Sequence, residues 1–247
     1  MSYQYPAIIF LIPFLAAICM PVVCRKKRDW CRPIALAAVF AMSAAALANL
    51  LNVLDVGETR YIFGGWLSSS NTTGVPIGIE WVNDGLASIM VVVISLLASA
   101  CVIYGGPVMS RSLGTRVVHY HTLILLLISG LIGIVFAGDI FNLFVFLEVV
   151  ALSAYALVGV RGGRALMVAF RYLILGTLGA SFYLLGIVFF YAATGTLNMA
   201  DMAQHLAENP ELMTSKAVIG GSTFMFIGLG IKMALFPLHG WLPGAYA

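Results

Sequence analysis

Three charged residues, Glu148, Arg171 and Lys232, lie inside long apolar runs of this 247-residue chain. A charge within a bilayer is costly, and such residues generally line ion pathways or form proton relays. Carboxyl and amino groups can take up and release a proton, whereas arginine stays protonated in proteins. We therefore treat Glu148 and Lys232 as candidate proton-transfer groups, and Arg171 as a group that can only tune a nearby carboxylate.

Glu148 lies nine residues after Asp139, or about 13–14 Å along a helix from the outer end of its apolar run. This depth is near the middle of a membrane. The residues that share its helical face carry no positive charge: Phe141, Phe144, Leu152 and Tyr155. We expect Glu148 either to meet a cation from another helix or to be protonated. The alternative is a neutral glutamate that only joins helices by a hydrogen bond.

The last apolar run contains Lys232, Pro237, His239 and Pro243. Each proline lacks an N–H group, so a helix here must break twice and leave carbonyls free. Free carbonyls at membrane depth are tolerated where they line a cavity or meet protein. A buried lysine and a histidine can both exchange protons near neutral pH. The alternatives are a static counter-ion to Glu148 for the lysine and an interfacial residue for the histidine.

Arg171 lies six residues after Ala165, about 9 Å inside the inner boundary of its run, so its side chain can also reach the interface. No sequence pattern indicates a metal, redox, flavin or nucleotide site. The four cysteines lack metal-ligand spacing, and we expect them to be structural: Cys19, Cys24, Cys31 and Cys101. We expect no catalytic residue and no cofactor.

The composition identifies the elements that must position these groups. The chain is 62% hydrophobic and 9% charged, with a mean hydropathy of +1.02. Soluble domains are about 45–50% apolar and about 25% charged. These values exclude a soluble enzyme, a nucleic-acid-binding protein and a disordered segment, and they predict a polytopic membrane protein.

Seven apolar runs are long enough to span a membrane, which predicts an all-α fold with about seven transmembrane helices, the seventh broken. In chain order the runs are 7–23, 33–54, 86–104, about 120–137, 140–160, 165–194 and about 217 to the end. Residues 59–84 differ, because aromatic and β-branched runs flank a polar turn, and they predict a small external β-hairpin between the second and third helices. Tyr61, Trp66 and Trp81 are candidate interface anchors. Asn71 begins a glycosylation sequon, which we interpret as chance.

The distribution of Lys and Arg predicts the orientation of the chain. Three loops on one side carry nine of the 13 basic residues, and the opposite loops carry Arg60 and Lys216. Those opposite loops hold eight of the 10 acidic residues. We expect a multi-pass protein of the cell inner membrane with its N-terminus outside and no cleavable signal peptide.

The segments GDIFNLFVFLEVVALSAYALVG and GIKMALFPLHGWLPGAYA resemble the two signature segments of antiporter-like proton-channel subunits. This family includes the D-type membrane protein of Mrp cation/proton antiporters and the homologous subunits of respiratory complex I and energy-converting membrane hydrogenases. The resemblance implies that Glu148 and Lys232 form the central pair of a proton half-channel. His239 falls in the family's PLHxWLP segment. Arg171 stands where many relatives carry a lysine, so the resemblance does not carry a proton-transfer role to that position.

Family members usually have about fourteen helices built around inverted repeats. The resemblance therefore implies an N-terminal three-helix region with the hairpin at 1–119 and an incomplete first repeat at 120–247. We expect the chain to be a fragment, or one half of a split subunit.

The leading functional interpretation is a proton-translocating membrane subunit of a larger complex, with no redox centre of its own. An enzymatic role arises only through a parent complex, such as a proton-translocating NADH:quinone oxidoreductase or a hydrogenase. Two alternatives are a sodium-handling antiporter subunit and a membrane scaffold that holds a hydrogenase or NADH dehydrogenase arm. A seven-helix receptor is disfavoured by the charges at Glu148 and Lys232. The expected partners are other membrane subunits and protons or sodium, not nucleic acid.

Overall fold

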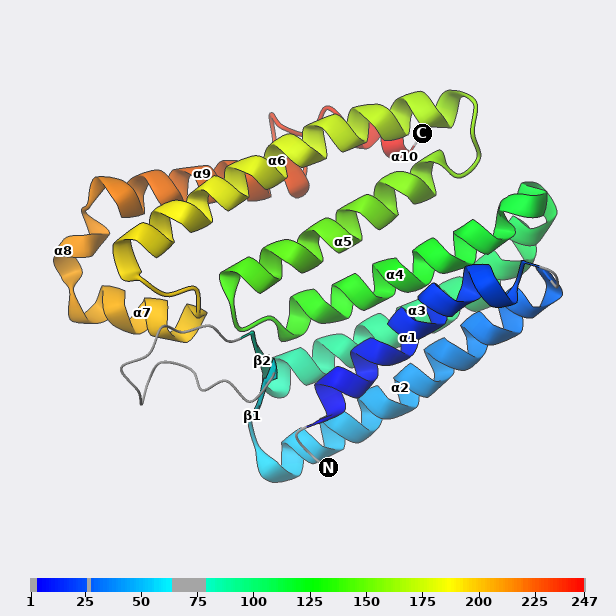
Figure 1. Ribbon diagram of the computed structural model, residues 1–247, viewed down its shortest axis with the longest axis horizontal. Helices are drawn as coiled ribbons and strands as arrows, with labels where there is room; N and C mark the ends of the chain where they lie inside the picture. The colour runs from blue at the N-terminus through cyan, green and yellow to red at the C-terminus, as the bar shows by residue number, and fades with distance from the viewer. Residues whose placement is uncertain (1–3, 26–27, 64–78, 247) are drawn as a thin grey trace.

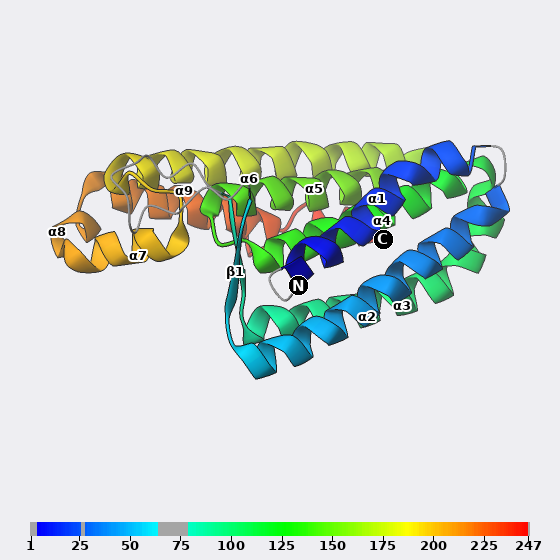
Figure 2. The same cartoon turned by 60° about the horizontal axis from the view of Figure 1, so that its bottom comes forward.

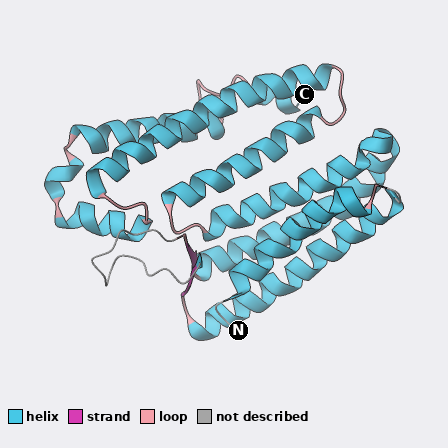
Figure 3. Cartoon of the chain, viewed as in Figure 1, coloured by secondary structure: helices cyan, strands magenta, loops and turns pink. Residues whose placement is uncertain are grey.

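The computed structural model describes residues 4–25, 28–63 and 79–246 and consists mainly of long helices that run alongside one another (Figures 1 and 3). Turned by 60°, the α2–α3 pair stands apart from the remaining helices at the end where the strands lie (Figure 2). The helices are α1 (Tyr5–Val23), α2 (Cys31–Val56), α3 (Gly85–Leu113), α4 (Val117–Phe136), α5 (Ile140–Gly159), α6 (Arg164–Thr194), α7 (Met199–Glu208), α8 (Pro210–Met213), α9 (Lys216–Lys232) and α10 (Leu242–Tyr246).

Within the described residues, five stretches are long and apolar enough to cross a membrane. They are Tyr5–Val23, Arg28–Val56, Gly85–Phe136, Ile140–Gly159 and Arg164–Thr194. The stretch Gly85–Phe136 contains both α3 and α4, joined by a 3₁₀ turn at Gly114–Arg116. The predicted helical membrane fold is confirmed, but the count of seven spans is not. The seventh apolar run yields only the 17-residue α9, because this helix ends at Lys232.

Short polar side chains set where several helices begin. The Asp139 carboxylate accepts hydrogen bonds from the backbone N–H groups of Phe141 and Asn142, at 2.8 and 2.7 Å, and so caps α5. Ser215 caps α9 in the same way through the N–H of Val218, at 3.2 Å. Such caps satisfy N–H groups that a helix leaves unpaired at its start. They fix the register of the two helices that carry Glu148 and Lys232.

Two short strands connect α2 to α3. β1 (Thr59–Ile62) pairs antiparallel with β2 (Glu80–Asn83), and Thr59 lies opposite Asn83. The predicted turn, the candidate anchor Trp66 and the sequon at Asn71 all fall outside the described residues. The strands are tied to the helices by side-chain hydrogen bonds of the buried Asn83 to Asn49 on α2, at 2.9 Å, and to Thr59, at 2.9 Å.

Trp81 was expected at the membrane interface, and the structure places it in the protein core instead. Its side chain is only 1% exposed, and its ring lies 4.8 Å from that of Phe63 and 5.9 Å from that of Phe136. The interface prediction for Trp81 is therefore wrong. A tryptophan on a short strand suits either place, and here the strand lies against the end of α4, where apolar partners are available.

The buried apolar residues form two clusters. The larger joins α1, α2, α3 and α4 and extends to Phe146 on α5. The smaller surrounds Tyr183 and Ile187 on α6, with Ile140 and Met202. Close to this cluster α6 and α9 approach through glycines, and a methyl group at Gly228 would lie 2.6 Å from the carbonyl oxygen of Gly179. Small residues of this kind let helix backbones come together in membranes.

Candidate functional site

Glu148 and Lys232 are in direct contact. The Lys232 Nζ atom lies 2.6 Å from Glu148 Oε1, and the two side chains are 12% and 22% exposed for the lysine and the glutamate. Glu148 lies near the middle of α5, and Lys232 is the last residue of α9. A mostly buried ion pair of this kind holds two charges whose separate burial would be costly.

The end of α9 positions Lys232. Ala234 has a φ of 52°, a left-handed conformation that ends a helix, and the N–H of Leu235 donates to the carbonyl of Gly230 at 2.8 Å. The break was expected at the prolines, but the helix ends before Pro237, because the ring of a proline excludes helical geometry in the turn that precedes it. The lysine charge therefore lies at the negative end of the α9 dipole, where a cation is favoured.

A cavity of about 130 Å³ lies beside the ion pair. Lys232 lines it together with Tyr155 of α5, Tyr172 of α6 and Trp241. The ring of Tyr172 contacts Tyr155 edge-on at 4.4 Å and stacks on Trp241 at 4.1 Å. The indole N–H of Trp241 donates to the carbonyl of Ile231 at 2.9 Å, which satisfies one of the carbonyls freed where α9 ends. This space is large enough for water molecules next to the ammonium group.

Gly176 on α6 makes room for the wall of this cavity. A methyl group at this position would collide with the hydroxyl group of Tyr155. The glycine therefore allows the Tyr155 side chain, which is almost fully buried, to cross from α5 to α6. The cavity wall and the spacing of the two helices depend on the same small residue.

The other two predicted site residues lie away from the pair. His239 is half-buried and stacks on Phe236 with ring centres 5.6 Å apart, and its Nδ1 atom is buried without a partner among the described residues. Arg171 is exposed on α6 and lines a second cavity of about 220 Å³, which shares Trp241 with the first. Within the described part of the chain, neither residue forms a hydrogen bond or ion pair with Glu148 or Lys232.

Sequence reasoning missed the aromatic wall. Tyr155 was identifiable as a residue on the helical face of Glu148, and Trp241 lies in the same proline-rich segment as His239. No spacing in the sequence connects Tyr172 to Trp241, because the stack forms only once the chain reverses after α9.

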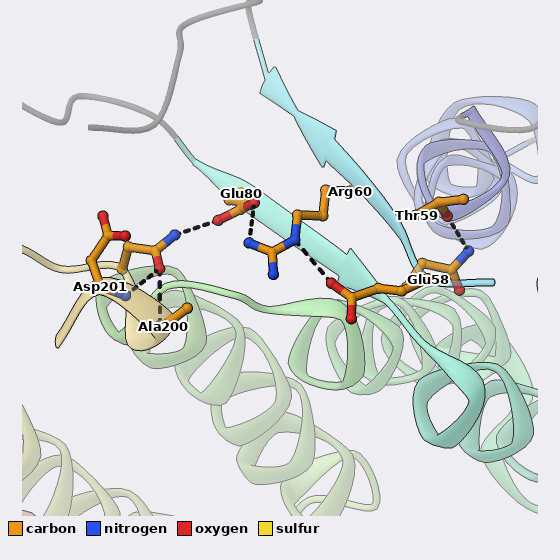
Figure 4. A network of polar contacts seen from close by, with 8 residues as sticks. Glu58, Thr59, Arg60, Glu80, Ala200 and Asp201 are labelled. Carbon is orange, nitrogen blue, oxygen red and sulfur yellow. Dashed lines mark hydrogen bonds and ion pairs between the residues drawn. The ribbon is translucent and has the colours of Figure 1, made fainter. Parts of the chain in front are cut away.

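A polar cluster joins three segments at the end of the bundle where α5 begins (Figure 4). Glu80 on β2 is buried and accepts hydrogen bonds from Asn198 and from Arg60, the latter at 3.3 Å. Its backbone carbonyl accepts from the N–H of Gly138 at 3.0 Å. Arg60 also pairs with Glu58 at 2.9 Å. The cluster thus ties the strands to the loops that precede α5 and α7.

Asp139 lies next to this cluster in the loop before α5. Burial raises the pKa of its carboxyl group, and the nearby charge of Glu80 adds to this rise. Hydrogen bonds from the N–H groups of Asn142 and Phe141 act in the opposite direction. The cap of the helix that carries Glu148 is therefore held in a partly desolvated polar setting.

Residues 137–247 match the family described as NADH:quinone oxidoreductase/Mrp antiporter, TM. The whole chain is 42% identical to the N-type membrane protein of the NADH-quinone oxidoreductase of Desulforudis audaxviator, over 100% of the chain and 48% of that protein. It is 29% identical to the D-type membrane protein of the Na(+)/H(+) antiporter of Bacillus subtilis, over 96% of the chain and 45% of that protein. The chain thus spans about half the length of these curated relatives.

Two solved structures are similar to this fold. A chain of the membrane-bound sulfane sulfur reductase, an archaeal respiratory membrane complex, matches with a TM-score of 0.84 and 31% identity, over 98% of this chain and 47% of that chain. A chain of the Mrp complex from Dietzia sp. matches with a TM-score of 0.80 and 26% identity, over 99% of this chain and 43% of that chain. The resemblance seen in the two signature segments is therefore confirmed over the length of the chain.

Proposed function

We propose that this chain, whose residues 137–247 belong to the NADH:quinone oxidoreductase/Mrp antiporter transmembrane family, carries protons as a membrane subunit of a multisubunit ion-pumping complex. The observation that supports the proposal most strongly is the contact of 2.6 Å between Lys232 and Glu148, both mostly buried. Two ionisable groups that can each hold a proton meet where a helix ends beside a cavity. This is the arrangement that a proton relay requires.

The exchange of protons follows from the mutual dependence of the two charges. In the paired state the glutamate is a carboxylate and the lysine an ammonium. A proton taken up by Glu148 neutralises the carboxylate and leaves the buried ammonium of Lys232 without its partner. Because an unpaired buried charge is costly, this favours release of the lysine proton to a further acceptor. One proton enters and one leaves, and the pair re-forms when the lysine is reprotonated and the glutamate loses its proton.

His239 and Arg171 have different parts in this proposal. His239 can accept a proton near neutral pH, and its half-buried ring lies in the segment that follows Lys232. It is the proposed further acceptor. Arg171 cannot release its proton, so its fixed positive charge on α6 tunes the proton affinity of the pair from the neighbouring cavity.

The setting of the chain is part of the same proposal. The partners are other membrane subunits of an Mrp, complex I or hydrogenase type of complex, in the cell inner membrane with the N-terminus outside. The chain crosses the membrane seven times, with α9 as the interrupted seventh span and the β1–β2 strands outside. It divides into an N-terminal region, 1–119, and an incomplete antiporter-like repeat, 120–247. Each of the five candidate spans is only 33–39% buried, which leaves apolar surface for lipid and neighbouring subunits.

Protons suit the site better than sodium. A bound sodium ion needs several oxygen ligands, as hard cations do. Glu148 is already paired with a cation, and the cavity beside it is lined by tyrosine, tryptophan and aliphatic side chains. We therefore place protons first, although the names of several relatives include sodium.

The decisive variant is Glu148→Gln in the intact complex, reconstituted into vesicles with a pH-sensitive dye. Glutamine preserves shape and hydrogen bonding but cannot exchange a proton, so transport should fall by at least about 100-fold. Glu208→Gln on the exposed α7 is the matched control, and it should transport as wild type does. Equal transport by Glu148→Gln and wild type, at matched assembly, would leave Glu148 with a structural role only.

A further inference from the structure

A second polar pocket lies at the end of the bundle where α2 begins, α3 ends and α4 begins. It has a volume of about 350 Å³ and shares no lining residue with the cavity beside Lys232. Among its lining residues are Arg28, Asp29, Arg32 and His121. Nothing in the proton relay uses these side chains.

His121 is the unexplained group in this pocket. It is fully buried, one turn into α4, and both of its ring nitrogens lack a hydrogen-bond partner among the described residues. Buried polar side chains are nearly always hydrogen-bonded, to protein, ligand or water. A histidine that lines a cavity and has no protein partner indicates that a bound molecule, directly or through water, completes its hydrogen bonds.

The charges of the pocket favour an anion. Arg28 and Arg32 are exposed, and neither forms an ion pair with a carboxylate in the described part of the chain. Asp29 is the one carboxylate in the lining, so the ionised groups leave one net positive charge. The stem of Arg32 lies over the backbone of α3, close enough that a methyl group at Gly106 would meet its Cδ atom at 3.3 Å. This packing holds a guanidinium group at the mouth, and guanidinium groups match phosphate oxygens in pairs.

The position of the pocket identifies the source of the phosphate. It lies at the ends of three long apolar helices, the level at which lipid headgroups meet a membrane protein. Exposed aromatic side chains lie near it on α3 and before α2, namely Tyr104, which is 79% exposed, and Trp30, which is 55% exposed. Tyrosine and tryptophan are enriched at this level of the membrane, and basic pockets between helix ends bind anionic headgroups.

We propose that Arg28, Arg32 and His121 form a binding site for the phosphate group of an anionic phospholipid. The guanidinium groups hold the phosphate oxygens at the mouth of the pocket, and the imidazole completes the site at its inner end. The site stands apart from Glu148 and Lys232, so Glu148→Gln should not change lipid binding.

The test is native mass spectrometry of the protein, purified with its accompanying subunits, in the presence of equal amounts of phosphatidylglycerol and phosphatidylcholine. Wild type should retain phosphatidylglycerol in preference. Arg28→Gln with Arg32→Gln should lower that preference about tenfold or more, since bonds to charged groups are lost. Arg32→Lys should keep most of it. His121→Leu should also lower it, because the imidazole no longer reaches the ligand.

The matched control is Arg161→Gln with Arg164→Gln, which removes the same charge near the start of α6, outside the pocket. This control should keep the preference for phosphatidylglycerol. Loss of preference in the control, or no preference in wild type, would overturn the proposal, as would unchanged preference in His121→Leu. Displacement of the lipid by excess inorganic phosphate would show a site for free phosphate instead, and would also overturn it.

Discussion

At the scale of single residues, the pairing of Glu148 with Lys232 decides how the two charges are accommodated. Their helices come from segments 84 residues apart in the chain, yet the side-chain atoms lie 2.6 Å from one another. Neither residue has an opposite charge on its own helix at the positions one turn away. The charges are therefore tolerated only because the fold brings α5 and the end of α9 together.

The role proposed for Arg171 can be separated from that of a side chain that only reaches the interface. Arg171→Gln should slow proton transport several-fold in reconstituted vesicles, because the fixed charge near the second cavity is lost, whereas Arg171→Lys should keep most of the rate. Thermal unfolding of each variant serves as the control for folding. If both variants transport as wild type does, Arg171 only anchors α6 at the membrane surface.

At the scale of elements, α5, α6 and α9 act together through small residues. Gly176 admits the Tyr155 side chain, and Gly179 and Gly228 admit close contact of the α6 and α9 backbones. The aromatic wall of the cavity and the end of α9 are joined by the hydrogen bond from Trp241 to Ile231. The position of Lys232 therefore depends on how closely α6 packs against both neighbours.

Gly176→Ala should disturb this packing. The added methyl group collides with the Tyr155 hydroxyl, so the helices or the ring must move, and overpacking of this kind costs about 1–3 kcal/mol. We expect a lower unfolding temperature in detergent together with reduced proton transport. Gly220→Ala on α9 is the matched control, because a methyl group there meets nothing within 4 Å. An equal effect of the two substitutions would contradict the packing role of Gly176.

At the scale of the whole molecule, the ends of the bundle differ in chemistry. One end carries the strands and the polar cluster around Glu80, and the other carries the pocket around Arg28, Arg32 and His121. This asymmetry follows the distribution of basic and acidic residues along the chain, which favours basic loops on the cytoplasmic side.

Cysteine labelling can test this orientation. In a background without native cysteines, Ser112→Cys at the end of α3 should react with an impermeant reagent only from the cytoplasmic side. Gln204→Cys on α7 should react only from outside. Both positions are exposed. Labelling with the two sides exchanged would reverse the proposed topology.

Much of the site was predictable, because a charge in an apolar run identifies itself. Glu148 and Lys232 were found for this reason, and proline chemistry indicated that the helix after residue 217 breaks. The end of α9 at Lys232, ahead of Pro237, depends on a left-handed Ala234 that no residue pattern predicts. The burial of Trp81 also depends on tertiary contacts, since the same residue on a strand suits an interface or a core.

The most direct test of the central claim, that Glu148 and Lys232 act as one coupled pair, is a double-mutant cycle on the thermal stability of the purified complex. Each single change, Glu148→Gln or Lys232→Ala, leaves a buried group without its partner, which costs about 3–5 kcal/mol when a charge remains. The double variant should lose less stability than the two single losses combined, with a coupling of at least about 1 kcal/mol. Losses that add within about 0.5 kcal/mol would show that the two residues do not sense each other and would contradict the account.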